Sequence, residues 1–278
     1  FTTGPIETIV EEEWVRANGT TLGADNGIGV SAALAVLASN TIKHGPVEVL
    51  LTATEETGMD GAEGLKPGML NGEILINMDS EDEGELYVGC AGGEDVGVKF
   101  RYSEKPAKKD YTGFKLSVTG MKGGHSGIDI ILGRGNAIKV FFRILNAAHQ
   151  KLGVRLAEFE GGSLRNAIPR EAFGLLSVKK TRKESFVKLV EDLTEVIKHE
   201  LSATEPTLAV TLEAVKNPKK VIAKKDQQKI TAAIVACPNG VIRMSDNMPG
   251  LVETSTNLAI VKSDTKKKTI TAACLMRS

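Results

Sequence analysis

The character of the sequence changes near residue 87, and this change constrains the folds that the chain can adopt. Before it, glycine and acidic residues surround two mostly apolar runs at residues 47–54 (VEVLLTAT) and 74–78 (ILINM). Continuous apolar runs of this length are typical of buried parallel strands. A helix of small residues is predicted over about 28–37. The first third therefore predicts part of a parallel α/β sheet.

Beyond residue 87 the composition changes, and five runs of strand length follow, at 96–102, 114–119, 173–178, 252–261 and 269–276. They predict an antiparallel sheet with one solvated face. Apolar residues recur at helical spacing over 137–148 and 186–197, and more weakly over 227–236. We therefore predict an α/β chain with part of a parallel-sheet domain at residues 1–90. An α+β domain, in which helices flank an antiparallel sheet, is predicted at 91–278.

Composition excludes several classes of partner. Thirty-five basic residues balance 35 acidic ones, so no excess positive charge would attract nucleic acid or an anionic membrane. The sequence contains no run of roughly 18 apolar residues, the length that a transmembrane helix needs. Its N-terminal segment carries acids where a secretory signal carries bases. The isolated cysteines Cys90, Cys237 and Cys274 predict buried thiols in a reducing compartment. We therefore predict a cytoplasmic protein.

Four acidic residues of the first third stand in loops or at predicted strand ends: Asp25, Glu55, Glu56 and Asp79. If these carboxylates converged they would repel one another unless divalent cations neutralised them. A metal pair bridged by one carboxylate could hold a water molecule between the ions. Within the adjacent pair, one glutamate could bind metal while the other takes a proton from that water. A solvated acidic turn is the alternative interpretation.

Two polar residues of the second part could contact a substrate. His125 lies in a glycine-rich loop (GGHSG), where it could donate a hydrogen bond to a developing oxyanion, or could be structural. Asn166 could bond a substrate carbonyl or cap the turn before Pro169. Gly27 and Gly29 fit a dinucleotide-binding pattern, but the residues before them predict a loop and not the strand that an NAD-binding domain requires.

Five ordered segments, TLGADNGIG, LLTATEETGMDGA, ILINMDSEDEGE, KGGHSG and LRNAIPREA, resemble the cytosolic dizinc dipeptidases of the aminoacylase/carboxypeptidase clan. The similarity is greatest to the bacterial Xaa-His (aminoacyl-histidine) dipeptidases, and continues through the final LMRS. It implies hydrolysis of a small dipeptide substrate at two zinc ions, for which cobalt or manganese could substitute. It also implies that residues 1–90 are part of the catalytic domain and residues 91–278 the lid domain.

The resemblance implies roles for individual residues. Asp25 would bridge both zinc ions, with Glu56 and Asp79 as terminal ligands of one ion each. Glu55 would be the general base that deprotonates the zinc-bridging water, and His125 would polarise the scissile carbonyl. The remaining pair, Asn166 and Arg277, would help to hold the substrate.

The sequence departs from this family in its histidines. A His-x-Asp motif before the bridging aspartate, a His-x-Gly-x-Glu type segment and a late zinc histidine are not found. We therefore expect an internal fragment of a longer enzyme, inactive by itself. The alternative is a non-catalytic relative whose lid is an oligomerisation or peptide-binding module, and the sequence leaves open whether two copies form a homodimer.

Overall fold

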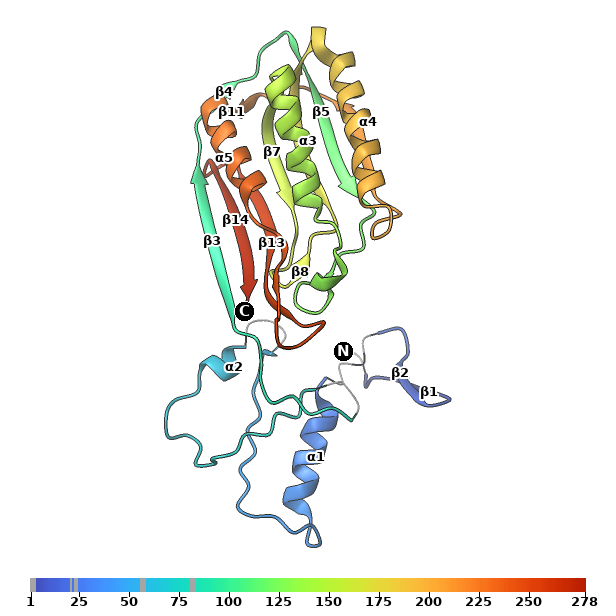
Figure 1. Ribbon diagram of the computed structural model, residues 1–278, viewed down its shortest axis with the longest axis vertical. Helices are drawn as coiled ribbons and strands as arrows, with labels where there is room; N and C mark the ends of the chain where they lie inside the picture. Colours follow the sequence, from blue (N-terminus) through green and yellow to red (C-terminus); the bar gives the residue numbers. More distant parts are fainter. Residues whose placement is uncertain (1–3, 21, 23–24, 56–58, 81–83) are drawn as a thin grey trace. The chain divides into compact units, whose positions relative to one another are not determined.

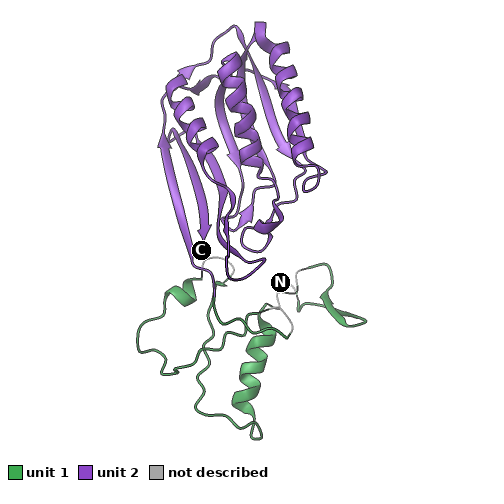
Figure 2. Cartoon of the chain, viewed as in Figure 1, with its two compact units in different colours: residues 1–89 green, residues 90–278 purple. Residues whose placement is uncertain are grey.

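The computed structural model describes residues 4–20, 22, 25–55, 59–80 and 84–278 (Figure 1). The chain divides into two compact units, residues 1–89 (unit 1) and 90–278 (unit 2) (Figure 2). Every residue of unit 2 is described. The assignment of a catalytic role to the first unit and a lid role to the second stays a prediction.

Unit 1 contains a hairpin of β1 (Thr8–Glu11) and β2 (Trp14–Ala17), followed by helices α1 (Gly27–Ala38) and α2 (Asp60–Glu63). Helix α1 confirms the predicted helix of small residues. It begins after Asn26, whose side-chain Oδ1 accepts a hydrogen bond from the Gly29 N–H at 2.7 Å. This is the capping that a helix start requires for its unpaired N–H groups.

The two strands predicted in unit 1 are not formed. Residues 47–54 and 74–78 are described, and neither run contains a strand. Their apolar side chains are largely exposed, Ile74 at 85% and Leu75 at 84%. A strand is stable only when a neighbour accepts and donates its backbone hydrogen bonds. Within the described part of unit 1 only β1 and β2 pair, so these two runs have no ladder to join.

Unit 2 is built on an eight-stranded sheet in the order β10-β5-β9-β7-β13-β14-β3, with β12 paired to β13. All of its strand pairs are antiparallel, as predicted. The strands are β3 (Gly93–Arg101), β5 (Tyr111–Thr119), β7 (Arg155–Gly161), β9 (Ala172–Lys179), β10 (Ala209–Val215), β12 (Gly240–Met244), β13 (Val252–Asp264) and β14 (Thr269–Arg277). The five predicted runs are confirmed as β3, β5, β9, β13 and β14, whereas β7, β10 and β12 were not predicted.

Two short ladders lie outside this sheet. Strand β4 (Glu104–Pro106) pairs with β11 (Lys220–Ile222), and β6 (Gly124–His125) pairs with β8 (Ala167–Ile168). The second ladder belongs to the candidate site.

Three helices cover one face of the sheet: α3 (Ala137–Leu152), α4 (Lys183–Glu200) and α5 (Lys224–Ala236) (Figure 1). They confirm the three predicted amphipathic helices. Helix α3 begins after Asn136, whose Oδ1 accepts from the N–H of Ile138 at 3.0 Å. It ends at Gly153, which has the left-handed φ of 69° typical of a helix C-terminus.

The core lies between the sheet and these helices. Alternate residues of β5, Phe114, Leu116 and Val118, are buried against them. Phe159 of β7 lies 4.7 Å, centroid to centroid, from both Phe141 and Phe142 of α3. Tilted ring pairs of this kind add to the free energy of burial. This packing gives the helix layer a defined position on the sheet. The loops at the end of the sheet thereby have a defined position too.

The cysteine prediction is wrong in part. Cys90 is exposed, and Cys237 and Cys274 are half-buried; all three are free thiols. Across the described residues, no helix is both long enough and apolar enough to cross a bilayer.

Candidate functional site

In unit 1, one side chain joins the segments that carry Asp25 and Asp79. Asn26, next to Asp25, donates a hydrogen bond from Nδ2 to the main-chain oxygen of Met78, next to Asp79. Gly29 permits this arrangement, because a Cβ at that position would lie 2.5 Å from Asn26 Nδ2. Two segments more than 50 residues apart in the sequence therefore meet at the start of α1. Both aspartates are exposed.

Glu55 follows Thr54, which makes hydrogen bonds with Met59 and Asp60. The Met59 N–H donates to the Thr54 carbonyl at 2.7 Å, and the Thr54 hydroxyl donates to Asp60 Oδ2 at 3.1 Å. Glu55 itself is exposed to solvent. Its neighbour Glu56, the predicted zinc ligand, lies outside the described residues.

The predicted zinc ligands could supply part of the coordination shell of a metal ion. Within the described residues, no group of three or more His, Cys, Asp or Glu side chains is placed to hold a metal ion. Asp25 and Asp79 would supply oxygen ligands only, whereas catalytic zinc sites take three protein ligands and usually include histidine. The described carboxylates could therefore contribute to a divalent-metal site but do not complete one.

The dinucleotide-binding alternative requires a strand ending just before Gly27. Asp25 and Asn26 form a turn, as expected, while Thr21, Gly23 and Ala24 lie outside the described part of the chain. The described residues thus give no support to a dinucleotide fold at this position.

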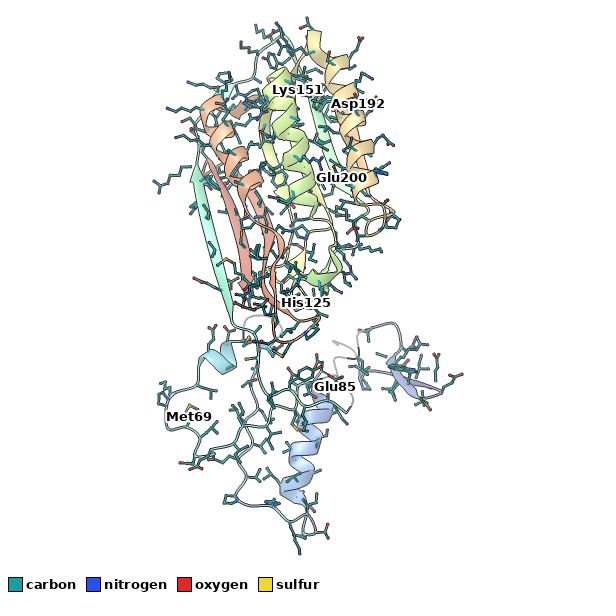
Figure 3. The ribbon with its side chains drawn as sticks, viewed as in Figure 1. Met69, Glu85, His125, Lys151, Asp192 and Glu200 are labelled. Atoms are coloured by element: carbon teal, nitrogen blue, oxygen red, sulfur yellow. The ribbon has the colours of Figure 1, made fainter. Side chains whose placement is uncertain are left out.

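In unit 2, the short β6–β8 ladder brings two predicted site residues together. His125 pairs with Ala167, and the Ser126 N–H donates to the main-chain oxygen of Asn166 at 2.7 Å. His125 is half-buried and Asn166 is exposed. The loops that carry these two residues, about 40 positions apart in the chain, are therefore held edge to edge. Figure 3 labels His125 among the side chains of unit 2.

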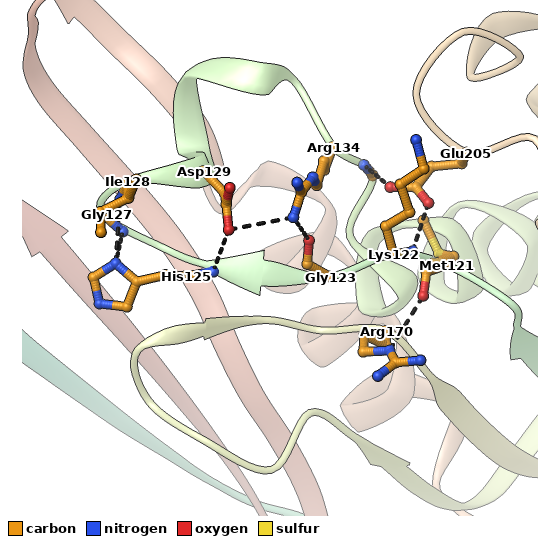
Figure 4. Close-up of polar contacts among 11 residues, drawn as sticks. Met121, Lys122, Gly123, His125, Gly127, Ile128, Asp129, Arg134, Arg170 and Glu205 are labelled. Carbon is orange, nitrogen blue, oxygen red and sulfur yellow. Dashed lines mark hydrogen bonds and ion pairs between the residues drawn. The ribbon is translucent and has the colours of Figure 1, made fainter. Parts of the chain in front are cut away.

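The hydrogen bonds of the His125 ring define its tautomer. Its Nδ1 accepts from the backbone N–H groups of Gly127 at 3.3 Å and Ile128 at 3.2 Å (Figure 4). A nitrogen that accepts two N–H groups carries no proton, so the neutral ring holds its proton on Nε2. Burial, and then the positive charge of Arg277, lower the pKa of His125, while Asp129 opposes this. The ring is thus a neutral Nε2–H donor, which is the form that can stabilise a developing oxyanion.

Three charged residues support the His125 loop, and none of them was predicted from the sequence. Asp129 Oδ2 accepts from the His125 N–H at 2.8 Å and lies 3.2 Å from Arg134 Nη1. Arg134 in turn donates to the carbonyl of Gly123 at 2.6 Å (Figure 4). The carboxylate of Glu205, 1% exposed, accepts from the Lys122 and Gly135 N–H groups at 2.7 and 2.9 Å. Of these three residues, only Asp129 could have been suspected from the sequence, because it stands four residues after a histidine in a glycine-rich loop.

The hydrogen-bond network around His125 requires a glycine at position 124. Gly124 has a φ of 132°, which side-chain-bearing residues rarely adopt. A Cβ there would lie 2.2 Å from Arg134 Nη1 and 2.4 Å from Asp129 Oδ2. The absence of a side chain at Gly124 therefore lets the Asp129–Arg134 pair reach the loop backbone.

Arg277, at the end of β14, lies against the same loop. A Cβ built on Gly127 would be 3.2 Å from both Cζ and Nε of Arg277. Nε of Arg277 is buried and has no hydrogen-bond partner among the described residues. A guanidinium in this state favours a carboxylate ligand, which can accept two parallel hydrogen bonds. The structure thus brings His125, Asn166 and Arg277 together within unit 2.

The chain is similar to known peptidases. Residues 116–205 match the family model described as Peptidase dimerisation domain. Over all 278 residues the chain is 47% identical to the Cytosol non-specific dipeptidase of Escherichia coli (strain K12) and spans 57% of that protein. It is also 36% identical over 90 residues to the Uncharacterized protein YqjE of Bacillus subtilis (strain 168), covering 31% of this chain and 24% of that protein.

A solved structure gives the same result. The Aminoacylhistidine Dipeptidase from Vibrio alginolyticus superimposes with a TM-score of 0.80 at 49% identity, covering 100% of this chain and 56% of that one. The chain therefore spans a little over half the length of both dipeptidases. This chain is therefore similar along its whole length to part of two dipeptidases, and residues 116–205 of unit 2 match the peptidase dimerisation domain.

Proposed function

We propose that this chain is part of a metal-dependent dipeptidase that hydrolyses Xaa-His dipeptides in the cytoplasm. The observation that carries the proposal is the identity of 47% and 49%, over the whole chain, to proteins named as dipeptidases. One of them is named for aminoacylhistidine substrates. The predicted site residues Asp25, Glu55 and Asp79 are present in the exposed loops of unit 1, where a substrate could reach them.

In unit 1, we assign the proton transfers to Glu55. Its carboxylate would take a proton from the attacking water and return it to the leaving amine, a role that suits an exposed glutamate beside a metal site. Asp25, Glu56 and Asp79 would hold divalent metal, with zinc as the proposed ion. When bound, such an ion supplies Lewis acidity and lowers the pKa of water.

In unit 2, we assign substrate recognition and charge stabilisation. The Nε2–H of His125 would donate to the scissile carbonyl oxygen as negative charge develops there. Arg277, whose Nε lacks a partner among the described residues, would bind the terminal carboxylate of the dipeptide. Asn166 would bond a peptide oxygen from the adjacent loop.

The 278-residue chain by itself should bind zinc weakly and hydrolyse no dipeptide at a measurable rate. Carboxylates alone, without nitrogen ligands, make a poor zinc site.

A second function, oligomerisation, is favoured by the peptidase dimerisation domain matched at residues 116–205. We propose that two copies associate through unit 2. Sedimentation of the chain should give the mass of a dimer. A monomer at high protein concentration would contradict this.

A chimaera tests the proposed activity. This chain would replace the matched 57% of the E. coli dipeptidase, so that the relative supplies the remaining ligands. The chimaera should release histidine from Ala-His with added zinc, and a chelator should abolish this. The chain alone should not. A folded, metal-loaded chimaera that is inactive on all dipeptides would contradict the proposal.

A further inference from the structure

Two of the three cysteines lie close together in unit 2, away from the His125 loop. The Sγ atoms of Cys237 and Cys274 are 3.6 Å apart. Cys237 follows the last residue of α5, and Cys274 lies on β14. Both are free thiols and half-buried, so small solutes can reach them. A disulfide has an S–S length of about 2.05 Å, so a side-chain movement of roughly 1.5 Å would join the two sulfur atoms.

Lys139 of α3 supplies positive charge beside this pair. Its Nζ donates to the main-chain oxygens of Ile234, Val235 and Cys237, at 3.0, 2.7 and 2.7 Å. The ammonium thereby offsets the partial negative charge at the C-terminal end of α5, which would otherwise disfavour an anion there.

The two thiols differ in acidity. The hydrogen bond with Cys274 lowers the pKa of Cys237 to about 6; burial opposes this, and the charge of Lys139 adds to it. The same hydrogen bond, together with burial, raises the pKa of Cys274. Cys237 is therefore the more acidic thiol of the pair, and the charge of Lys139 favours its thiolate form. This combination is typical of a reactive cysteine with a resolving partner.

We propose that Cys237 and Cys274 form a peroxide-reactive dithiol that closes to an intramolecular disulfide. The Cys237 thiolate attacks one oxygen of hydrogen peroxide; an S–O bond forms, the O–O bond breaks, and the departing hydroxide takes up a proton to give water. Cys237 is then a sulfenic acid. The Cys274 sulfur attacks Cys237 Sγ, the S–O bond breaks, and the hydroxyl leaves as a second water with the Cys274 proton. Two thiols are thereby oxidised to one disulfide and one peroxide is reduced to two waters.

The disulfide would join the helix layer to the sheet near the candidate site. Arg277 stands three residues beyond Cys274 on β14, and Asn239 stands two beyond Cys237. The Asn239 side chain accepts from the Leu258 N–H at 2.9 Å and from Asn136 Nδ2 at 2.9 Å. Because the disulfide would link the segment after α5 covalently to β14, oxidation should raise the thermal unfolding midpoint of unit 2. A thiol reductant should reverse this shift.

Mass spectrometry of the peroxide-treated chain tests this proposal. The intact mass should fall by two hydrogen atoms, and a digest should contain Cys237 linked to Cys274. Cys90→Ser should behave identically, because the exposed Cys90 takes no part. Cys274→Ser should leave a sulfenic acid on Cys237 that dimedone traps, whereas Cys237→Ser should leave Cys274 unmodified.

Two results would overturn the proposal. The first is a digest of the folded wild-type chain in which peroxide modifies Cys90 alone, with Cys237 and Cys274 still free; this result does not depend on any variant folding. The second is a dimedone adduct on Cys274 in Cys237→Ser at the rate seen for Cys237 in Cys274→Ser, which would show that the two sulfur atoms do not differ in reactivity.

Discussion

The carboxylate of Asp129 holds the backbone of His125: its Oδ2 accepts the His125 N–H at 2.8 Å. The same oxygen lies 3.2 Å from Arg134, which binds the Gly123 carbonyl on the other side of the histidine. One acid therefore connects both ends of the segment that aims the His125 ring. We infer that Asp129 is a positioning residue for the proposed oxyanion donor.

Asp129→Ala in the chimaera should lower kcat for Ala-His about 10- to 100-fold with a smaller change in KM, because misplacing a catalytic donor acts mainly in the transition state. Asp129→Asn keeps an acceptor oxygen and should lose less. The exposed Asp192 of α4 provides the control, since Asp192→Asn should leave both constants unchanged.

The tautomer of His125 distinguishes a positioning role of Asp129 from a purely structural one. Nitrogen NMR of the chain should show an unprotonated Nδ1 and a protonated Nε2 in the wild type, and a mixture of tautomers in Asp129→Ala. An unchanged tautomer together with an unchanged kcat would remove the positioning role.

Gly124→Ala should destabilise unit 2. The new Cβ would lie 2.2 Å from Arg134 Nη1, in a backbone conformation with a φ of 132°. Strain of this kind amounts to about 1–3 kcal/mol, measurable as the free energy of unfolding in urea. Gly97→Ala is the matched control, because a Cβ on Gly97 meets no heavy atom within 4 Å. Equal losses in the two variants would contradict the account of the Gly124 loop.

His149 should make unit 2 less stable in mild acid. The residue is 5% exposed, its Nδ1 lies 2.9 Å from the Val154 carbonyl, and its Nε2 is buried without a partner among the described residues. Burial is the main cause of its lowered pKa. As the pH falls below about 6.5, the unfolded chain binds a proton that the folded chain binds only at lower pH. The stabilising effect of neutral His149 is therefore complete above that pH and is lost as the pH falls toward the folded-state pKa.

Urea unfolding between pH 7.5 and pH 5 measures this effect. One such group contributes at most about 1.4 kcal/mol per pH unit. His149→Gln should flatten the pH dependence, whereas exchange of the exposed His199 for Gln should not. The same slope in His149→Gln and wild type would exclude His149 as the source.

Hydrogen exchange should distinguish the apolar runs of unit 1 from the sheet of unit 2. Residues 47–54 and 74–78 form no strand, so we expect their amides to exchange rapidly. Amides of β5, which pair on both sides with β9 and β10, should be the slowest. Strong protection in residues 74–78 of the isolated chain would show that this run has found a pairing partner.

These two runs also show where sequence reasoning stops. Local patterns sufficed for α3, whose apolar residues face one side, and for β13 and β14, which pair as an antiparallel hairpin close in the sequence. Residues 47–54 have an equally clear strand composition, but a strand also needs a neighbour, and hydrophobicity does not specify which segment that is. Strands β7 and β10 were also missed, and β10 pairs with β5, at least 90 residues earlier in the chain.

The candidate site also contains both residues that the sequence predicts and residues that it does not. His125 was recognisable from its glycine-rich loop and Arg277 from its family motif. Glu205 was not, because its partners are the backbone N–H groups of Lys122 and Gly135, at least 70 residues away. Likewise the contact of Cys237, just after α5, with Cys274 of β14 depends on tertiary packing that no spacing in the sequence encodes.

The most direct test of the proposed function compares two glutamates of unit 1 in the chimaera. Glu55→Gln keeps the size of the side chain but removes the base. It should reduce kcat/KM for Ala-His by at least about 100-fold, the usual contribution of a general base. Glu73→Gln, at another exposed position of the same unit, should change kcat/KM by less than about twofold, since it removes the same charge without touching the site. If Glu55→Gln keeps the activity of the Glu73→Gln control, Glu55 is not the base and the proposed mechanism is wrong.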